Sequence, residues 1–136
     1  MDVKNAVYPD PAQIKDFFGA PEDGPFVMVN LLKFKVKAEY PDGAEPELSG
    51  REAYDRYGAE VSKLVIALGG KIRYSGAVTG LMLGEVEDLW DAVALAEYPS
   101  LAAFQAMATS PEYRAIEHHR TAGLAGQLNI RTKPRG

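Results

Sequence analysis

Two stretches of this chain are apolar at both odd and even positions, and they constrain its fold more than any other feature. They are residues 25–34 (PFVMVNLLKF) and residues 89–99 (LWDAVALAEYP), and both are rich in β-forming side chains. Successive side chains of a strand point to opposite faces of its sheet, so a strand that is apolar at both parities is covered on both faces. We therefore predict two central strands of one sheet.

Residues that cap helix N-termini predict the helices. Ser49 and Glu52 have capping-box spacing, and the apolar stripe that follows them at helical spacing ends at Gly69. This pattern predicts the longest helix of the chain. Shorter helices are predicted after three further caps, two of which are followed by a proline at the first helical position: Asp10, Ser100 and Ser110.

Two more strands complete the predicted sheet. One covers residues 71–86, where three glycines suggest bulges, and the other covers residues 126–132. Both carry polar side chains, as edge strands do. After the first short helix the order is β-α-β-β-α-β, which predicts a ferredoxin-like α+β fold with helices on one face of a four-stranded antiparallel sheet. We expect one domain over residues 1–136, with an N-terminal helical extension (1–24) and a core (25–132).

The apolar character of the central strands also predicts a partner. In this topology all helices pack on one face of the sheet, so the other face would expose a large apolar patch to water. The chain has no element left to cover that face. We therefore expect a two-fold homodimer in which two copies pack sheet against sheet.

Composition narrows the class of function. The net charge is −4, and no segment collects enough lysine and arginine to bind nucleic acid. The chain has no cysteine, which excludes disulfides, zinc ribbons, iron–sulfur clusters and thiol nucleophiles. The sequence shows neither a signal-peptide core nor an apolar run of the ~20 residues that span a bilayer. We expect a cytoplasmic protein with no membrane partner.

Several segments in a fixed order resemble one protein family. They are MVNLLKFK, GGKI, WDAVALAEYPSLAAF, SPEY and HRTAGL, and together they are similar to the family called domain of unknown function 1330, over residues 25–132. That family belongs to the dimeric α/β-barrel superfamily. The resemblance implies a ferredoxin-like fold and a homodimer whose two sheets form a barrel. It implies no reaction, although relatives in the superfamily include cofactor-independent monooxygenases, muconolactone isomerase, haem-degrading enzymes and stress-responsive proteins.

Both histidines of the chain are adjacent, within PEYRAIEHHRTAG (residues 111–123). Neighbouring helix positions point about 100° apart, so His118 and His119 cannot chelate one ion together, and we predict no metal site. His118 is expected to face solvent. His119 is either a half-buried histidine with a backbone partner or an acid–base group of a pocket. Arg120 beside it either binds an anion or pairs with a core carboxylate.

Four other residues are candidates for a site between the helices and the sheet. Asn30 interrupts a buried strand, so its amide either bonds across the sheet or faces a cavity. Tyr54 and Tyr57 share the inner face of the long helix, where aromatic residues usually form core. If a pocket lies there, their phenols and the Trp90 indole would be its polar lining.

Two classes of function fit these residues. The first is a cofactor-independent enzyme, monooxygenase- or isomerase-like, that acts on a small apolar or aromatic metabolite. Its catalytic candidates are His119 and Tyr57, and its ligand-binding candidates are Asn30, Tyr54, Trp90 and Arg120. The second is a non-catalytic homodimer that binds a small ligand or acts in a stress response. We expect no cofactor, and a haem with His119 as axial ligand is a weaker third alternative.

Overall fold

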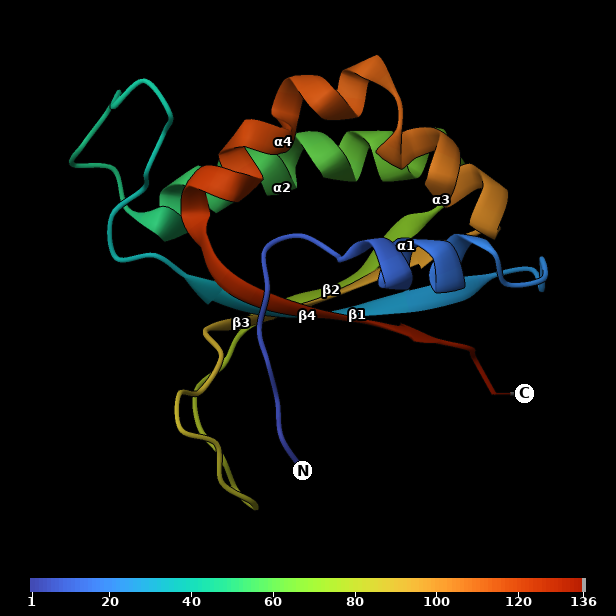
Figure 1. The fold of residues 1–136 in the computed structure, drawn as a ribbon, viewed down its shortest axis with the longest axis horizontal. Coiled ribbons are helices and arrows are strands. Elements are labelled where there is room, and N and C mark those ends of the chain that lie inside the picture. Colours follow the sequence, from blue (N-terminus) through green and yellow to red (C-terminus); the bar gives the residue numbers. More distant parts are fainter. Residues whose placement is uncertain (136) are drawn as a thin grey trace.

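The computed structural model describes residues 1–135 and shows a four-stranded sheet with helices on one side of it (Figure 1). The chain follows the order α1 (Pro11–Phe18), β1 (Phe26–Phe34), α2 (Gly50–Ala67), β2 (Lys71–Ala77), β3 (Ala92–Tyr98), α3 (Leu101–Ala108), α4 (Pro111–Gly123) and β4 (Leu124–Thr132). The strands lie in the order β2-β3-β1-β4, and every pair is antiparallel. The predicted ferredoxin-like fold, with β1 and β3 in the centre, is confirmed.

The helix N-termini form as their capping residues predicted. The Ser49 hydroxyl accepts from the Glu52 backbone N–H at 3.0 Å, and the Glu52 carboxylate accepts from the Ser49 N–H at 3.0 Å. Asp10 caps α1 in the same reciprocal way with Gln13. The second crossover is divided into α3 and α4 because Ser110 caps a new helix that begins with Pro111.

The prediction of a strand over residues 71–86 was wrong in its length. β2 ends at Ala77, which pairs with Ala92 at the start of β3, so later residues have no strand opposite them. The residues between the two strands form a long loop on the side of the sheet away from the helices (Figure 1). The irregularity in β2 lies between Ile72 and Tyr74 rather than at the glycines.

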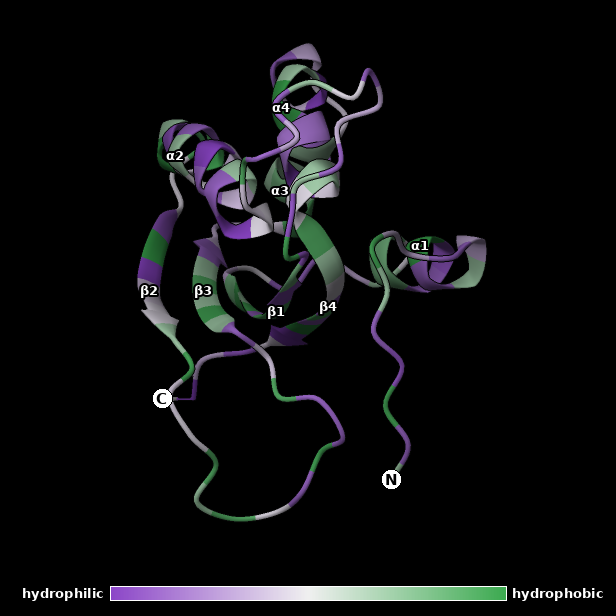
Figure 2. Ribbon diagram, turned by 90° about the vertical axis from the view of Figure 1, so that its left-hand side faces the viewer, coloured by the Kyte–Doolittle hydropathy of each residue, from purple (hydrophilic) through white to green (hydrophobic). Residues whose placement is uncertain are grey.

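The core lies between the helices and the sheet. Even-numbered residues of β1 and β3 point toward the helices and form the core with α2 and α3; they include Phe26, Met28, Ala96 and Tyr98, which pack with Val65, Leu101 and Met107. α1 extends this core on the β4 side of the sheet (Figure 2), where Phe17 and Phe18 contact Phe104.

Odd-numbered residues of β1 and β3 point to the opposite side of the sheet. We call this side the open face, and the even-numbered residues of β4 from Gly126 onward share it because they pair with odd-numbered residues of β1. Its apolar residues are Val27, Val29, Leu31, Val93, Leu95, Leu128 and Ile130. Val29 lies near its centre, between Leu95 on β3 and Ile130 on β4. No helix of the described chain covers the open face, whereas the β2–β3 loop and the N-terminal segment project on that side (Figure 1).

The start of α2 and the end of α4 approach each other through two glycines. The Gly50 N–H donates to the Lys35 carbonyl at 3.1 Å, and the Lys35 N–H donates to the Gly123 carbonyl at 2.8 Å. A Cβ atom on Gly123 would lie 2.3 Å from the Gly50 carbonyl oxygen. The crossing therefore requires residues without side chains, and it holds α4 against α2 above the sheet. Within residues 1–135, no helix is long and apolar enough to cross a membrane.

Candidate functional site

A chain of three polar side chains connects α4 to the centre of the sheet. The Arg120 guanidinium donates to Gln127 Oε1 at 2.7 Å, and Gln127 Nε2 donates to Asn30 Oδ1 at 2.7 Å. Asn30 Nδ2 in turn donates to the Ala94 carbonyl of β3 at 3.1 Å. Of the two alternatives for Asn30, the structure therefore shows hydrogen bonds across the sheet. Among residues 1–135, Arg120 is therefore paired with the amide of Gln127 and with no carboxylate.

Gln127, the middle member of these three hydrogen-bonded side chains, was not among the site residues predicted from the sequence. It is only 7% exposed, although it lies on an edge strand with polar neighbours. The register explains its burial, because Gln127 pairs with Leu32 and so shares the helix-facing side of the sheet. The amide oxygen of Gln127 accepts from Arg120 and its amide nitrogen donates to Asn30. Because both atoms are hydrogen-bonded, burying this amide beside a cation costs little folding free energy.

The tyrosines of α2 have different surroundings although they lie three residues apart. The Tyr57 hydroxyl is 3.1 Å from that of Tyr113 on α4, and burial raises the pKa of Tyr57 well above its usual value. Burial also raises the pKa of Tyr54 to about 12, an effect that the positive charge of Arg120 partly opposes. Both phenols are therefore protonated at neutral pH, and each can donate a hydrogen bond but cannot act as a base.

Tyr54 lines a cleft between α2 and the sheet. The cleft has a volume of about 150 Å³, and its lining residues are Leu32, Phe34, Arg51, Tyr54, Asp55, Ser75, Gly76, Ala77, Ala92 and Ala94. The space exists because the facing positions of β2 and β3 carry small residues. Among residues 1–135 no group pairs with the Tyr54 hydroxyl, whereas Tyr57 is bonded to Tyr113. Tyr54 is thus the predicted site residue whose polar atom is free beside a cavity.

His119 lies in a separate cluster under the loop between β1 and α2. Its Nδ1 is 2.7 Å from the Tyr40 hydroxyl, which can donate to it, and the Tyr40 oxygen is 3.5 Å from Arg56. Arg56 is also held by Glu45 in an ion pair of 2.6 Å. His118 is exposed, as expected, and its ring centroid lies 3.9 Å from that of His119. His119 is half-buried, and its partner is a tyrosine side chain instead of backbone.

The surroundings of His119 lower its pKa from the usual 6.5, first through burial and then through the nearby positive charges of His118 and Arg56. These contacts share no residue with the contacts of Tyr57, Asn30 or Arg120. The structure thus brings Asn30 and Arg120 together through Gln127, while His119 and Tyr57 each lie elsewhere. The neutral imidazole fits its role as acceptor from Tyr40.

A lowered histidine pKa makes stability depend on pH. The unfolded chain binds a proton at His119 more readily than the folded chain does, so we expect the free energy of unfolding to decrease as pH falls from about 7.5 to 5.5. Urea unfolding at several pH values would measure this slope. His119→Gln should reduce the slope, and the control His118→Gln should retain more of it. An unchanged slope in His119→Gln would contradict this assignment.

Trp90 lies away from the other candidates. Its indole N–H donates to Asn5 Oδ1 at 2.7 Å, which ties the end of the β2–β3 loop to the N-terminal segment. Trp90 is not among the residues that line the cleft under α2. Over the described part of the chain, no group of three or more His, Cys, Asp or Glu side chains is placed to hold a metal ion.

The chain is similar to proteins of one family. A family model described as domain of unknown function (DUF1330) matches residues 44–132. The solved structure of RPA0582, a protein of unknown function from Rhodopseudomonas palustris, is 34% identical with a TM-score of 0.87, over 98% of this chain and 99% of that one. The methylated form of RPA0582 is 35% identical with a TM-score of 0.89, over 98% of both chains.

A more distant structure shares the fold alone. It is a dabb family protein with a ferredoxin-like fold from Mesorhizobium loti, which is 14% identical with a TM-score of 0.51, over 84% of this chain and all of the other (100%). A search of curated proteins found no match.

Proposed function

Because this chain belongs to the DUF1330 family, whose description assigns no activity, we propose its function from its own surfaces: a homodimer that binds a small apolar or aromatic ligand in the cleft under α2. The observation that carries this proposal is the Tyr54 hydroxyl, which no group among residues 1–135 occupies, beside a cavity lined by both apolar and polar side chains. Apolar walls together with a few placed polar groups are the features by which a small-molecule site binds and orients its ligand. A protonated phenol in it favours a ligand that carries a hydrogen-bond acceptor, such as a carbonyl oxygen.

The hydrogen bonds of the other candidates favour binding over catalysis. Asn30 and Arg120 are both occupied by Gln127, and Tyr57 is occupied by Tyr113. His119 is held by Tyr40 outside the cleft. Groups that satisfy one another stabilise the fold, so none of these four residues is free to transfer a proton to a ligand in the cleft. Because His119 lies outside the cleft, it could not be the axial ligand of a haem bound there.

Cofactor-independent catalysis is a second candidate, supported by Asp55. Asp55 is a lining residue of the same cleft as Tyr54 and occupies the adjacent position of α2. A carboxylate could take a proton from the carbon next to a carbonyl group while the phenol stabilises the negative charge that develops on the oxygen. This isomerase-like step needs no cofactor, because the electron pair of the broken C–H bond is delocalised into the carbonyl group.

Acetophenone and ethylbenzene form a matched pair of probes, since only the first has a carbonyl group. We expect acetophenone to shift the NMR signals of residues that line the cleft. Tyr54→Phe should weaken its binding about tenfold, as the loss of one hydrogen bond to a buried group does, and leave ethylbenzene unaffected. Equal weakening of both probes, or shifts confined to other residues, would contradict the proposal.

The same samples in D₂O distinguish binding from catalysis. Catalysis would replace the methyl protons of acetophenone by deuterium faster than buffer does, and Asp55→Asn would remove that acceleration. Exchange at the buffer rate would leave binding as the function of the cleft.

The homodimer is proposed from the open face. Its seven apolar residues form a continuous surface across β3, β1 and β4, which a second copy would cover. The β2–β3 loop adds three consecutive exposed residues on the same side of the sheet, namely Leu81, Met82 and Leu83. In a sheet-to-sheet dimer this loop would reach past the sheet edge toward the partner.

A further inference from the structure

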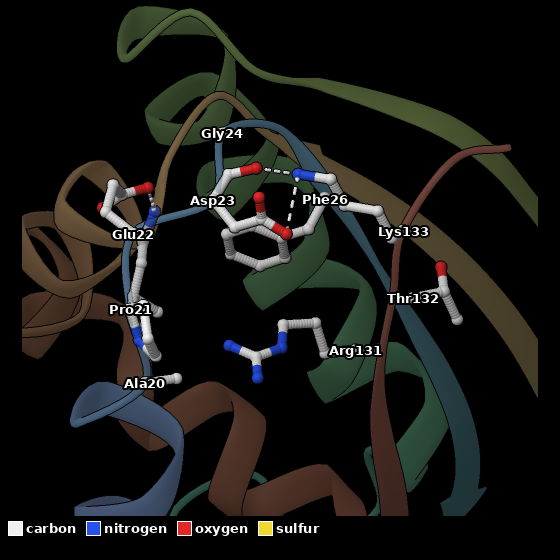
Figure 3. A pocket seen from close by; sticks show the side chains of 10 residues that line it. Ala20, Pro21, Glu22, Asp23, Gly24, Phe26, Arg131, Thr132 and Lys133 are labelled. Carbon is white, nitrogen blue, oxygen red and sulfur yellow. Dashed lines mark hydrogen bonds and ion pairs between the residues drawn. The ribbon is translucent and has the colours of Figure 1, made fainter. Parts of the chain in front are cut away.

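A second hollow lies at the other end of the sheet, between the α1–β1 connection and the end of β4 (Figure 3). Its volume is about 380 Å³, which is within the roughly 300–1,000 Å³ of small-molecule sites. Apolar side chains form part of its wall, from Ala20, Pro21, Phe26 and Leu101. None of its lining residues belongs to the cleft under α2.

Arg131 is the charged group that points into this hollow (Figure 3). It pairs with Met28 across β4 and β1, so its side chain lies on the helix-facing side of the sheet. The guanidinium carbon is 4.7 Å from the centroid of the Phe17 ring, a distance at which the ring attracts a cation. Within residues 1–135, no carboxylate lies in ion-pair distance of Arg131. Phe17 thus fixes the guanidinium while its N–H donors stay available.

The other charged groups around the hollow are already paired. The Glu22 carboxylate accepts from the backbone N–H groups of Leu101 at 2.8 Å and Ala102 at 3.0 Å, and so caps α3. Asp23 pairs with Lys133 at 3.5 Å. Two acids and one lysine are therefore engaged with groups of the protein, and Arg131 is the charged residue of the lining whose side chain is bonded to no protein group among residues 1–135.

We propose that this hollow binds a small carboxylate with an apolar or aromatic body. The planar guanidinium offers two parallel N–H donors, which match the two oxygens of a carboxylate. The body of the ligand would lie against Phe26 and Leu101. The inference does not depend on the cleft under α2, because it uses none of its residues.

Phenylacetate and phenylacetamide test the proposal on the unmodified protein, since they differ in charge at one group. In an NMR titration of the full chain, phenylacetate should shift the Arg131 side-chain N–H signal and the backbone signals of residues 20–24. Phenylacetamide should bind at least about tenfold more weakly, as expected when a charge-assisted hydrogen bond is lost. Equal affinity for the two, shifts confined to other residues, or no binding of phenylacetate would overturn the proposal.

Three variants locate the effect. Arg131→Gln should weaken phenylacetate binding about tenfold or more, with its unfolding temperature measured as a check on the fold. Lys133→Gln removes the neighbouring cation that is already paired, so it should change the affinity less than about twofold. Tyr54→Phe should leave the shifts that phenylacetate causes at Arg131 and residues 20–24 unchanged, which separates this site from the cleft under α2. Loss of binding in Lys133→Gln with retention in Arg131→Gln would contradict the assignment.

Discussion

Replacing Gly50 by alanine should destabilise the protein by about 3 kcal/mol, the upper end of the cost of overpacking. A Cβ atom at this position would lie 2.1 Å from the Lys35 carbonyl oxygen and 2.7 Å from the Gly123 carbonyl oxygen. Both are backbone atoms, and moving them would break the hydrogen bonds that join β1, α2 and α4. Urea unfolding followed by circular dichroism would measure the loss.

Gly58 provides the matched control on the same helix. A Cβ atom there would meet no atom within 4 Å. Gly58→Ala should therefore stabilise the protein by about 0.5–1 kcal/mol, because alanine loses less conformational freedom in a helix than glycine does. If Gly50→Ala and Gly58→Ala unfolded at the same urea concentration, this result would contradict the close approach of α2 and α4.

Val29→Glu should convert the proposed homodimer into a folded monomer. The side chain lies near the centre of the open face, between Leu95 and Ile130. In a sheet-to-sheet dimer the substitution would bury two unpaired carboxylates, each costing about 3–5 kcal/mol, so the dissociation constant should rise at least about 1,000-fold. The monomer should keep its helices and sheet, because the substituted position points away from the core.

Sedimentation velocity would show this change, with Ile66→Glu as the control. Ile66 is an apolar residue on α2 that is 63% exposed, so its replacement adds the same charge away from the open face. Ile66→Glu should remain dimeric. A wild-type protein that sediments as a monomer, or a Val29→Glu variant that stays dimeric, would refute the proposed assembly.

The sequence predicted the order of the strands because that order depends on local pattern. Residues 25–34 and 89–99 are apolar at both parities, and only central strands need this composition. The length of β2 could not be predicted in the same way. Residues 78–83 have the composition of a strand, but a strand forms only where another lies beside it, and β3 begins at Ala92.

The contacts of the candidate site could not be predicted because they join distant positions. Asn30 and Gln127 are 97 residues apart, and their pairing depends on the register between β1 and β4. His119 finds its partner Tyr40 in the connection between β1 and α2, outside every predicted helix and strand. Tyr54 and Tyr57 share one helical stripe, so only the packing of α4 decides which hydroxyl is occupied.

A crystal structure of the unmodified protein with acetophenone would test the proposed site most directly. We predict density for one molecule in the cleft under α2, with its carbonyl oxygen about 2.8 Å from the Tyr54 hydroxyl, an ordinary O–H···O distance. An empty cleft, or a bound molecule whose carbonyl group faces away from Tyr54, would contradict the proposed function.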